Sequence, residues 1–167
     1  MKILSETESQ NAMKFIMEAA KVAEESLCLR ANCGAVIVKD GNVIGRGFNS
    51  PPQNNPKFRT CAQEYDIPVG FRHDRTCCIH AEQRAIVDAI KKGNDTQGAT
   101  IYFTNIDHSK KPIKSYRLCC TICSRAVLDA GISEFVLQWE DDTVRSWPTD
   151  EFNSLSYEYK TPIKKGT

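Results

Sequence analysis

The sequence predicts an α/β domain in which helices cover a central mixed sheet of about five strands. Helical and strand-like patterns alternate along the chain, and such alternation is typical of layered α/β domains. Two apolar runs flank Asp40-Gly41, which indicates an antiparallel hairpin. The two central helical patterns end at Gly93 and Gly131, residues that commonly terminate helices. The 167 residues are enough for one such domain with a buried core.

The elements are predicted from their hydrophobic periods in chain order. Apolar residues at helical spacing occupy residues 6–27, and Ser5 with Glu8 forms a capping box at the start. Thr7 with Gln10 is an alternative start. The same reasoning predicts helices over 80–92, 120–130 and 149–155, and strands over 35–38, 43–47, 99–104 and 134–138.

Two long segments without sustained periodicity separate these elements. Residues 50–76 contain four prolines, and residues 105–118 are polar and basic. Loops of this length inside a compact domain are usually functional. We expect a single domain over residues 1–167, with its core at about 8–140 and a polar C-terminal tail at about 156–167.

Composition argues against several classes of function. The formal net charge of +1 gives no global field that would attract a nucleic acid. The longest apolar runs are too short to span a bilayer, and the first ten residues do not have the pattern of a signal peptide. We therefore expect a cytoplasmic protein with neither a membrane nor a nucleic acid as its partner.

Eight cysteines are a high number for this chain, and one pair has the spacing of a metal site. In a cytosolic protein, clustered thiols are more often metal-binding or catalytic than disulfide-bonded. Cys120 and Cys123 begin a predicted helix, so both sulfurs project toward one side. His80 begins another and supplies a nitrogen. Such a donor set suits zinc and leaves a fourth position for water. We predict that His80, Cys120 and Cys123 bind Zn²⁺.

Glu82 lies two residues after His80, too close in sequence to be a comfortable second ligand. A carboxylate beside metal-activated water can take a proton and return it to a leaving group. We therefore predict that Glu82 is the catalytic acid and base.

These residues resemble a known family. His-Ala-Glu at 80–82 followed by C-x-x-C at 120–123 resembles the signature of the zinc-dependent cytidine and deoxycytidylate deaminases. The resemblance extends from about Cys33 to Gln138 and includes the hairpin CGAVIVKDGNVIGRGFN. It implies a three-layer α/β/α cytidine-deaminase-like fold. It also implies that activated water attacks an amine-bearing ring carbon, while Glu82 moves protons until ammonia leaves. By the same resemblance, Asn49 and the backbone of Ala81 contact the substrate.

The long spacing between Asn49 and His80 resembles the deoxycytidylate branch. This implies a cytosine nucleotide or nucleoside as substrate, with dCMP favoured, and family members commonly form homo-oligomers. The resemblance also raises a second, structural zinc site, with ordinary loop thiols as the alternative; its candidate ligands are Cys61, His73, Cys77 and Cys78. Cys119 stands where the family usually has proline, which would preset the first helical φ.

Basic residues in the two long loops are candidates for binding a phosphate, and a solvated loop surface is the alternative. They are Arg72, Arg75, Lys110, Lys111, Lys114 and Arg117. Phe71 and Tyr116 are candidates for stacking on a base.

Three rival functions remain open. One is deamination of another amino-heterocycle, such as a pterin, a guanine-like base or a riboflavin precursor. Another is a non-catalytic, zinc-stabilised binding module, in which Glu82→Ala would leave function intact. The third is a thiol redox protein that cycles Cys120 and Cys123, which gives His80 no role.

Overall fold

The computed structural model describes residues 1–61, 64–67, 78–118 and 120–157. In chain order its elements are β1 (Lys2–Ile3), α1 (Glu6–Ala23), β2 (Asn32–Lys39), β3 (Asn42–Phe48), the short 3₁₀ helices η1 (Pro52–Asn54) and η2 (Pro56–Phe58), α3 (Ala81–Lys91), β4 (Thr100–Ile106), β5 (Pro112–Ile113), α4 (Thr121–Asp129), β6 (Glu134–Gln138), β7 (Val144–Pro148) and α5 (Thr149–Leu155). No helix in these ranges is long and apolar enough to cross a membrane.

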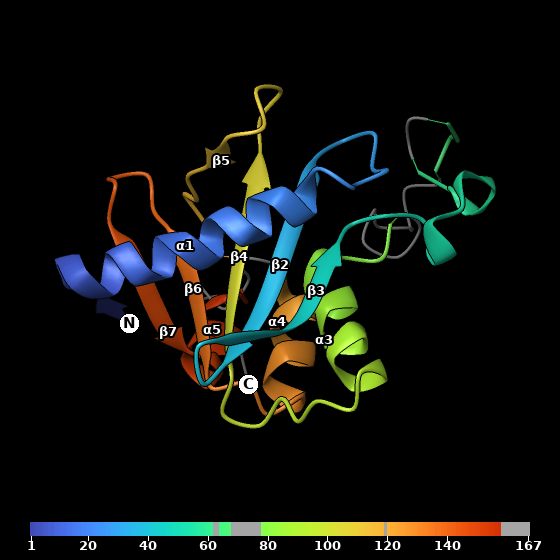
Figure 1. The fold of residues 1–167 in the computed structure, drawn as a ribbon. Helices are drawn as coiled ribbons and strands as arrows, with labels where there is room; N and C mark the ends of the chain where they lie inside the picture. The colour runs from blue at the N-terminus through green and yellow to red at the C-terminus, as the bar shows by residue number, and fades with distance from the viewer. Residues whose placement is uncertain (62–63, 68–77, 119, 158–167) are drawn as a thin grey trace, which may run out of the picture.

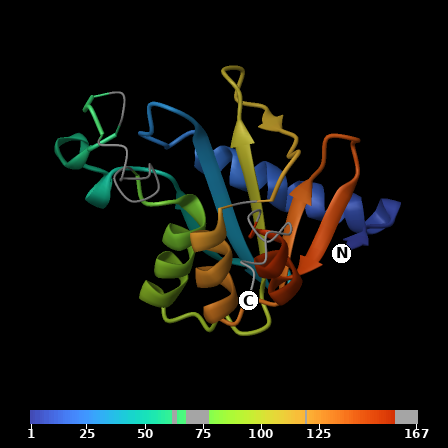
Figure 2. The same ribbon diagram turned by 180° about the vertical axis from the view of Figure 1, so that it is seen from behind.

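The strands form one mixed sheet in the order β1-β7-β6-β4-β2-β3, with β5 paired to β4. Among the described strands, β4 and β6 pair in parallel and the other pairs are antiparallel. Helix α1 covers one face, while α3, α4 and α5 cover the other (Figures 1 and 2). The predicted three-layer α/β/α fold is therefore confirmed. The sheet has seven strands rather than about five, because the two-residue strands β1 and β5 and the strand β7 add to it.

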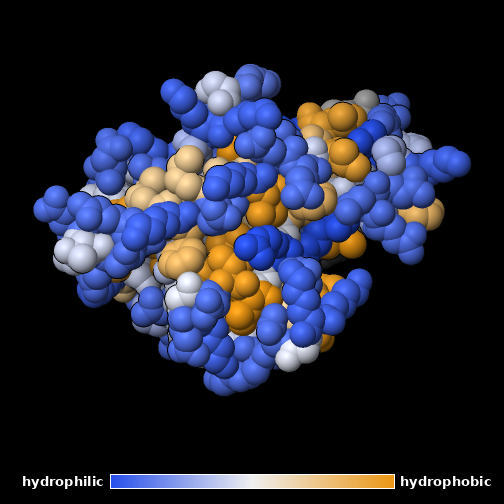
Figure 3. Space-filling view, viewed as in Figure 1, coloured by the Kyte–Doolittle hydropathy of each residue, from blue (hydrophilic) through white to orange (hydrophobic). Residues whose placement is uncertain are grey.

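Helix α1 begins at the predicted capping box. The Ser5 backbone N–H donates to Glu8 Oε2 at 2.9 Å, and the Glu8 N–H donates to Ser5 Oγ at 3.5 Å. The helix ends at Ala23, four residues before the predicted end at residue 27. Beyond it, the Ser26 hydroxyl donates at 2.7 Å to the backbone oxygen and side-chain oxygen of Asn49, and this binds the chain to the end of β3. Polar side chains cover much of this face, and apolar side chains are exposed between them (Figure 3).

The predicted hairpin consists of β2 and β3. Its turn places Asp40 at φ 50° and Gly41 at φ 75°, the left-handed conformation that tight hairpin turns require. Helix α3 packs directly on the backbone of β3. A Cβ atom at Gly47 would lie 2.2 Å from the Ala81 carbonyl oxygen and 2.3 Å from the Ala85 nitrogen. The absence of a side chain at Gly47 therefore sets the position at which α3 begins.

Gly47→Ala is expected to destabilise the protein by about 1–3 kcal/mol, because α3 must move away from β3 to make room. Chemical denaturation would measure the loss. The matched control is Arg46→Ala, which changes an exposed side chain on the same strand. Equal stability of the two variants would contradict this account of the close approach.

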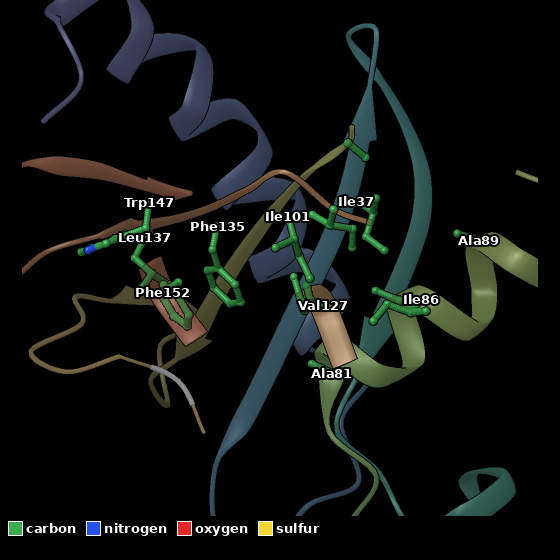
Figure 4. Packing of buried hydrophobic residues seen from close by; sticks show 14 residues of the cluster. Ile37, Ala81, Ile86, Ala89, Ile101, Val127, Phe135, Leu137, Trp147 and Phe152 are labelled. Atoms are coloured by element: carbon green, nitrogen blue, oxygen red, sulfur yellow. The ribbon is translucent and has the colours of Figure 1, made fainter. Parts of the chain in front are cut away.

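The main core lies between the sheet and helices α3, α4 and α5, as Figure 4 shows. Ile37 of β2 and Ile101 of β4 are fully buried at its centre. Phe135 of β6 stacks on Phe152 of α5 with ring centroids 4.1 Å apart, and the Trp147 ring meets Phe152 edge-on at 5.8 Å. This packing anchors α5 to the sheet beside α4.

Candidate active site

The structure brings the three predicted zinc ligands together at the N-termini of α3 and α4. His80 is the N-cap residue of α3, Cys120 is the N-cap residue of α4, and Cys123 lies in the first turn of α4. His80 Nδ1 lies 3.0 Å from Cys123 Sγ and 3.5 Å from Cys120 Sγ, and the two sulfurs are 3.4 Å apart. Within the described ranges, these three residues form the one cluster of histidine, cysteine and acidic side chains that is suited to a metal ion.

The geometry of this triangle fits zinc. Tetrahedral zinc holds one imidazole nitrogen and two thiolate sulfurs about 3.6–3.8 Å from one another, so the triangle needs to open by at most about 0.6 Å. Hydrogen bonds from the side chain of Cys123 and from His80 lower the pKa of Cys120 to about 4, although burial opposes the shift. Cys120 is therefore a thiolate at neutral pH, which is the form that binds a metal.

Glu82 lies in the first turn of α3 with only 3% of its surface exposed. It is the one acidic or basic residue among the buried residues that the structure describes. Burial raises the pKa of its carboxyl group above the ordinary value, and the charge of His80 opposes the shift. A buried carboxyl group with a raised pKa is suited to taking up and returning a proton. Its position supports the predicted catalytic role.

Asn49 follows β3 and is also buried. Its Oδ1 accepts hydrogen bonds from the Cys33 backbone N–H at 2.8 Å and from the Ser26 hydroxyl at 2.7 Å, while its Nδ2 donates to the Ala31 carbonyl at 2.7 Å. Both lone pairs of Oδ1 are therefore used, and one hydrogen of Nδ2 remains. Asn49 holds residues 26–33 in place, and toward a ligand it can act only as a donor.

A cavity of about 660 Å³ connects these residues, a size typical of small-molecule sites. Its lining includes the predicted ligands His80 and Cys120 together with Glu82, Ala81 and Asn49, while Cys123 is buried behind it. Cys28 and Cys33 also line the cavity. Burial is the main cause that raises the pKa of the Cys33 thiol, and the nearby charge of Glu82 raises it further. Cys33 is thus a neutral thiol beside the site.

Three cations line the same cavity: Arg30, Lys114 and Arg117. Lys114 pairs with Asp142 at 2.6 Å, whereas the Arg117 guanidinium lies 5.4 Å from the Tyr116 ring centroid. Sequence reasoning identified Lys114 and Arg117 but missed Arg30. The antiparallel hairpin was the signal that could have found Arg30, since it places the chain before β2 next to the end of β3, where Asn49 lies.

The remaining predicted residues either do not line the cavity or fall outside the described residues. Cys61 and Cys78, from the predicted second zinc site, are both buried, while His73 and Cys77 lie outside the described residues, so that site stays a prediction. Cys119 also lies outside them. Of the other candidate phosphate and base contacts, Phe71, Arg72 and Arg75 are outside as well, Lys110 pairs with Glu24 at 2.6 Å, and Lys111 does not line the cavity.

Comparison with known proteins places this site in a family. Residues 7–139 match the family model of the cytidine and deoxycytidylate deaminase zinc-binding region. ComE operon protein 2 of Bacillus subtilis is 31% identical over 118 residues, which are 71% of this chain and 53% of that protein. The deoxycytidylate deaminase of Mycobacterium phage D29 is 30% identical over 128 residues, 73% of this chain and 89% of that protein. The chain thus spans about half of the first relative and most of the second.

The fold is shared with a solved structure, the dCMP deaminase from cyanophage S-TIM5 in complex with dCMP and dUMP. The two chains superpose with a TM-score of 0.56 at 20% identity, over 79% of this chain and 81% of the other. The matched region of the family model includes both helix N-termini that carry the predicted zinc ligands. The chain belongs to the zinc-binding family of cytidine and deoxycytidylate deaminases.

Proposed function

We propose that this protein is a zinc-dependent hydrolytic deaminase that converts dCMP to dUMP and releases ammonia. The observation that carries the proposal is the triangle of His80, Cys120 and Cys123. Two of its members, His80 and Cys120, line the same cavity as the buried carboxyl group of Glu82. A redox function for the two cysteines would leave both His80 and Glu82 without a role. The name of the phage D29 relative supports the deoxycytidylate branch of the family.

The residues divide the reaction between them. Zinc held by His80, Cys120 and Cys123 would supply Lewis-acid activation of water. Oxygen from water bonds to the amine-bearing ring carbon, the bond from that carbon to nitrogen breaks, and ammonia leaves. Glu82 takes the proton from the attacking water and delivers it to the leaving nitrogen. Ala81 is the first residue of α3, so its backbone N–H has no partner within the helix and is available to the ring carbonyl oxygen.

Arg30 and Arg117 support a monophosphate substrate over a nucleoside. Both side chains line the cavity, and neither forms an ion pair with another described residue. Among the described residues that line the cavity, the buried Glu82 is the only acidic one. Guanidinium groups bind phosphate oxygens in pairs, so these two residues are suited to hold the 5′-phosphate at the cavity entrance.

Ammonia release across a substrate panel would test the reaction. The panel is cytosine, cytidine, deoxycytidine, CMP, dCMP, adenosine, guanine and a pterin, with zinc content measured on the same sample. We expect release from dCMP in preference to deoxycytidine. Release from the pterin or from guanine alone would instead support the rival amino-heterocycle function, and zinc without release from any substrate would favour a binding module.

Arg30→Gln and Arg117→Gln are each expected to raise KM for dCMP about 10- to 100-fold, because each loses charge-assisted hydrogen bonds to the phosphate. The rate with deoxycytidine should not change. Steady-state kinetics with both substrates would measure the difference. Arg125→Gln is the matched control, since Arg125 is exposed on α4 and does not line the cavity. A KM equal to that of the control would exclude a phosphate contact.

We further propose that the protein acts in the cytoplasm as a homo-oligomer with a single domain over residues 1–167. None of the six cysteines that the structure describes forms a disulfide, in keeping with a reducing compartment. The outer face of α3 exposes Val87 and Ile90 by 48% and 61%, and such apolar side chains are suited to contact another subunit. Light scattering of the purified protein would give its oligomeric state.

A further inference from the structure

The residue that directly follows each predicted zinc-binding cysteine is hydrogen-bonded to the end of α5. Thr121 follows Cys120, and its hydroxyl donates to the Ser156 carbonyl oxygen at 2.8 Å. Ser124 follows Cys123, and its Oγ lies 2.9 Å from Ser156 Oγ. The side-chain oxygen of Asn153, in α5, lies 3.1 Å from the same Ser124 Oγ. We call Thr121, Ser124, Asn153 and Ser156 the hydroxyl cluster.

Two members of the hydroxyl cluster, Ser124 and Ser156, are buried, and Thr121 and Asn153 are half-buried. Ser156 Oγ donates to the Asn153 carbonyl at 2.7 Å, so its lone pairs can accept from Ser124 Oγ. The single Ser124 proton is shared between Ser156 Oγ, the Asn153 side-chain oxygen and the Thr121 carbonyl oxygen, all within 3.1 Å. Ser124 and Ser156 are 1% and 7% exposed. A buried polar cluster in which each member has a partner holds its groups in one arrangement, because any displacement leaves a group unpaired.

Helix α5 provides a fixed point for this cluster. Its first residue, Thr149, is buried and donates to the Ile132 carbonyl at 2.6 Å. Phe152 stacks on Phe135 with an angle of 8° between the rings, and Figure 4 shows Phe152 beside Phe135 and Leu137. The helix is therefore held at its start to the segment before β6 and at Phe152 to β6 itself, and its C-terminal end reaches the first turn of α4.

The first turn of α4 needs such support. The helix has only nine residues, and helix ends fray. Its first turn holds both predicted zinc-binding cysteines with their sulfurs 3.4 Å apart, so a small shift of this turn displaces both predicted ligands at once. The cap that the turn provides for itself is a weak one, from the Cys123 N–H to Cys120 Sγ at 3.4 Å.

We propose that the hydroxyl cluster positions the zinc-binding turn, with Thr121 and Ser124 as positioning residues for Cys120 and Cys123. The proposal rests on the proposed function, because it assumes that these cysteines hold zinc. Thr121 and Ser156 also line the cavity, so the same contacts fix one wall of the substrate site. Removing a hydrogen bond to a metal ligand commonly changes metal affinity about 10- to 100-fold, and contacts that act one residue away from the ligand should fall at the lower end of this range.

The test is the rate at which zinc-loaded protein transfers its metal to an excess of a chromogenic chelator. Thr121→Val and Ser124→Ala should each release zinc about tenfold faster than the wild type. Thr121→Ser, which keeps the hydroxyl, should release it at the wild-type rate. The matched control is Thr96→Val, because Thr96 is also buried and donates to the Ala130 carbonyl at 2.6 Å, at the opposite end of α4.

The outcomes separate this proposal from the one on which it rests. Release from Thr121→Val and Ser124→Ala at the rate of Thr96→Val would overturn the positioning role, while the proposed function would stand. A folded wild-type protein that holds no zinc would overturn the proposed function and the positioning role together. If Ser124→Ala does not fold, the comparison of Thr121→Val with Thr121→Ser decides, since Thr121 is only half-buried.

Discussion

Glu82→Gln is expected to lower the rate of dCMP deamination by about 10²- to 10⁴-fold while zinc content and fold are preserved. The substitution keeps the shape of the side chain but removes the group that carries the proton from water to the leaving nitrogen. Glu82 does not belong to the ligand triangle, so the metal should remain. Ammonia release and zinc content, measured on the same preparation, would show both effects.

Stability provides a control for this variant. Burial raises the pKa of Glu82 above 4.5 in the metal-free chain, so the folded state resists its ionisation. The loss of folding stability that this causes is absent below the pKa of Glu82 in the unfolded chain. It grows as the pH rises from that value to the higher pKa of Glu82 in the folded chain. Metal-free Glu82→Gln should therefore match the wild type at pH 4 and be at least as stable at pH 7. Normal turnover by zinc-loaded Glu82→Gln would contradict the acid–base role of Glu82.

Cys123→Ser is expected to lower the affinity for zinc by more than about 100-fold. Activity should be lost together with the metal. Cys123 is fully buried and is the ligand that lies 3.0 Å from His80 Nδ1. A serine hydroxyl keeps its proton at neutral pH and is a poor zinc ligand, so only His80 and Cys120 would remain. Zinc content after dialysis against a chelator would measure the loss.

The control is Cys28→Ser, which changes a half-buried thiol in the cavity lining. Cys28 lies outside the ligand triangle, so this variant should keep one zinc ion per chain. Equal zinc retention in Cys123→Ser and Cys28→Ser would show that the metal is bound elsewhere.

The ligand triangle was predictable from sequence because each half is a local pattern at the start of a helix. His80 and Glu82 precede one apolar stripe, and the cysteine pair begins another, so spacing alone indicated which side chains converge. Strand β7 was missed because its pattern is irregular. Ser146 occupies a buried position in it, and its hydroxyl donates to Glu134 of β6 at 3.0 Å. When a buried polar residue has its hydrogen-bond partner on a neighbouring strand, the sequence of its own segment does not indicate that the residue is buried.

Contacts between distant segments set the parts of the site that were not predictable. Arg30 reaches the cavity because Asn49 hydrogen-bonds to Ala31 and so holds the loop before β2 in place. Ser156 reaches the cavity because α5 packs on the sheet. The same holds for the early end of α1, where helical propensity continues but the Ser26 hydroxyl binds Asn49 instead. Such residues are found by following hydrogen bonds outward from the site, since their own sequence context is ordinary.

The separation of the metal ligands along the chain also affects how the protein is made. His80 and Cys120 are forty residues apart, with the whole of β4 between them, so no short segment contains the complete site. Zinc therefore cannot nucleate folding locally, as it does in small zinc domains whose ligands lie within a few turns. A chain emerging from the ribosome would acquire its metal only after β4 has paired and α4 has docked beside α3. With these predicted ligands, metal loading would be a late step that follows formation of the sheet.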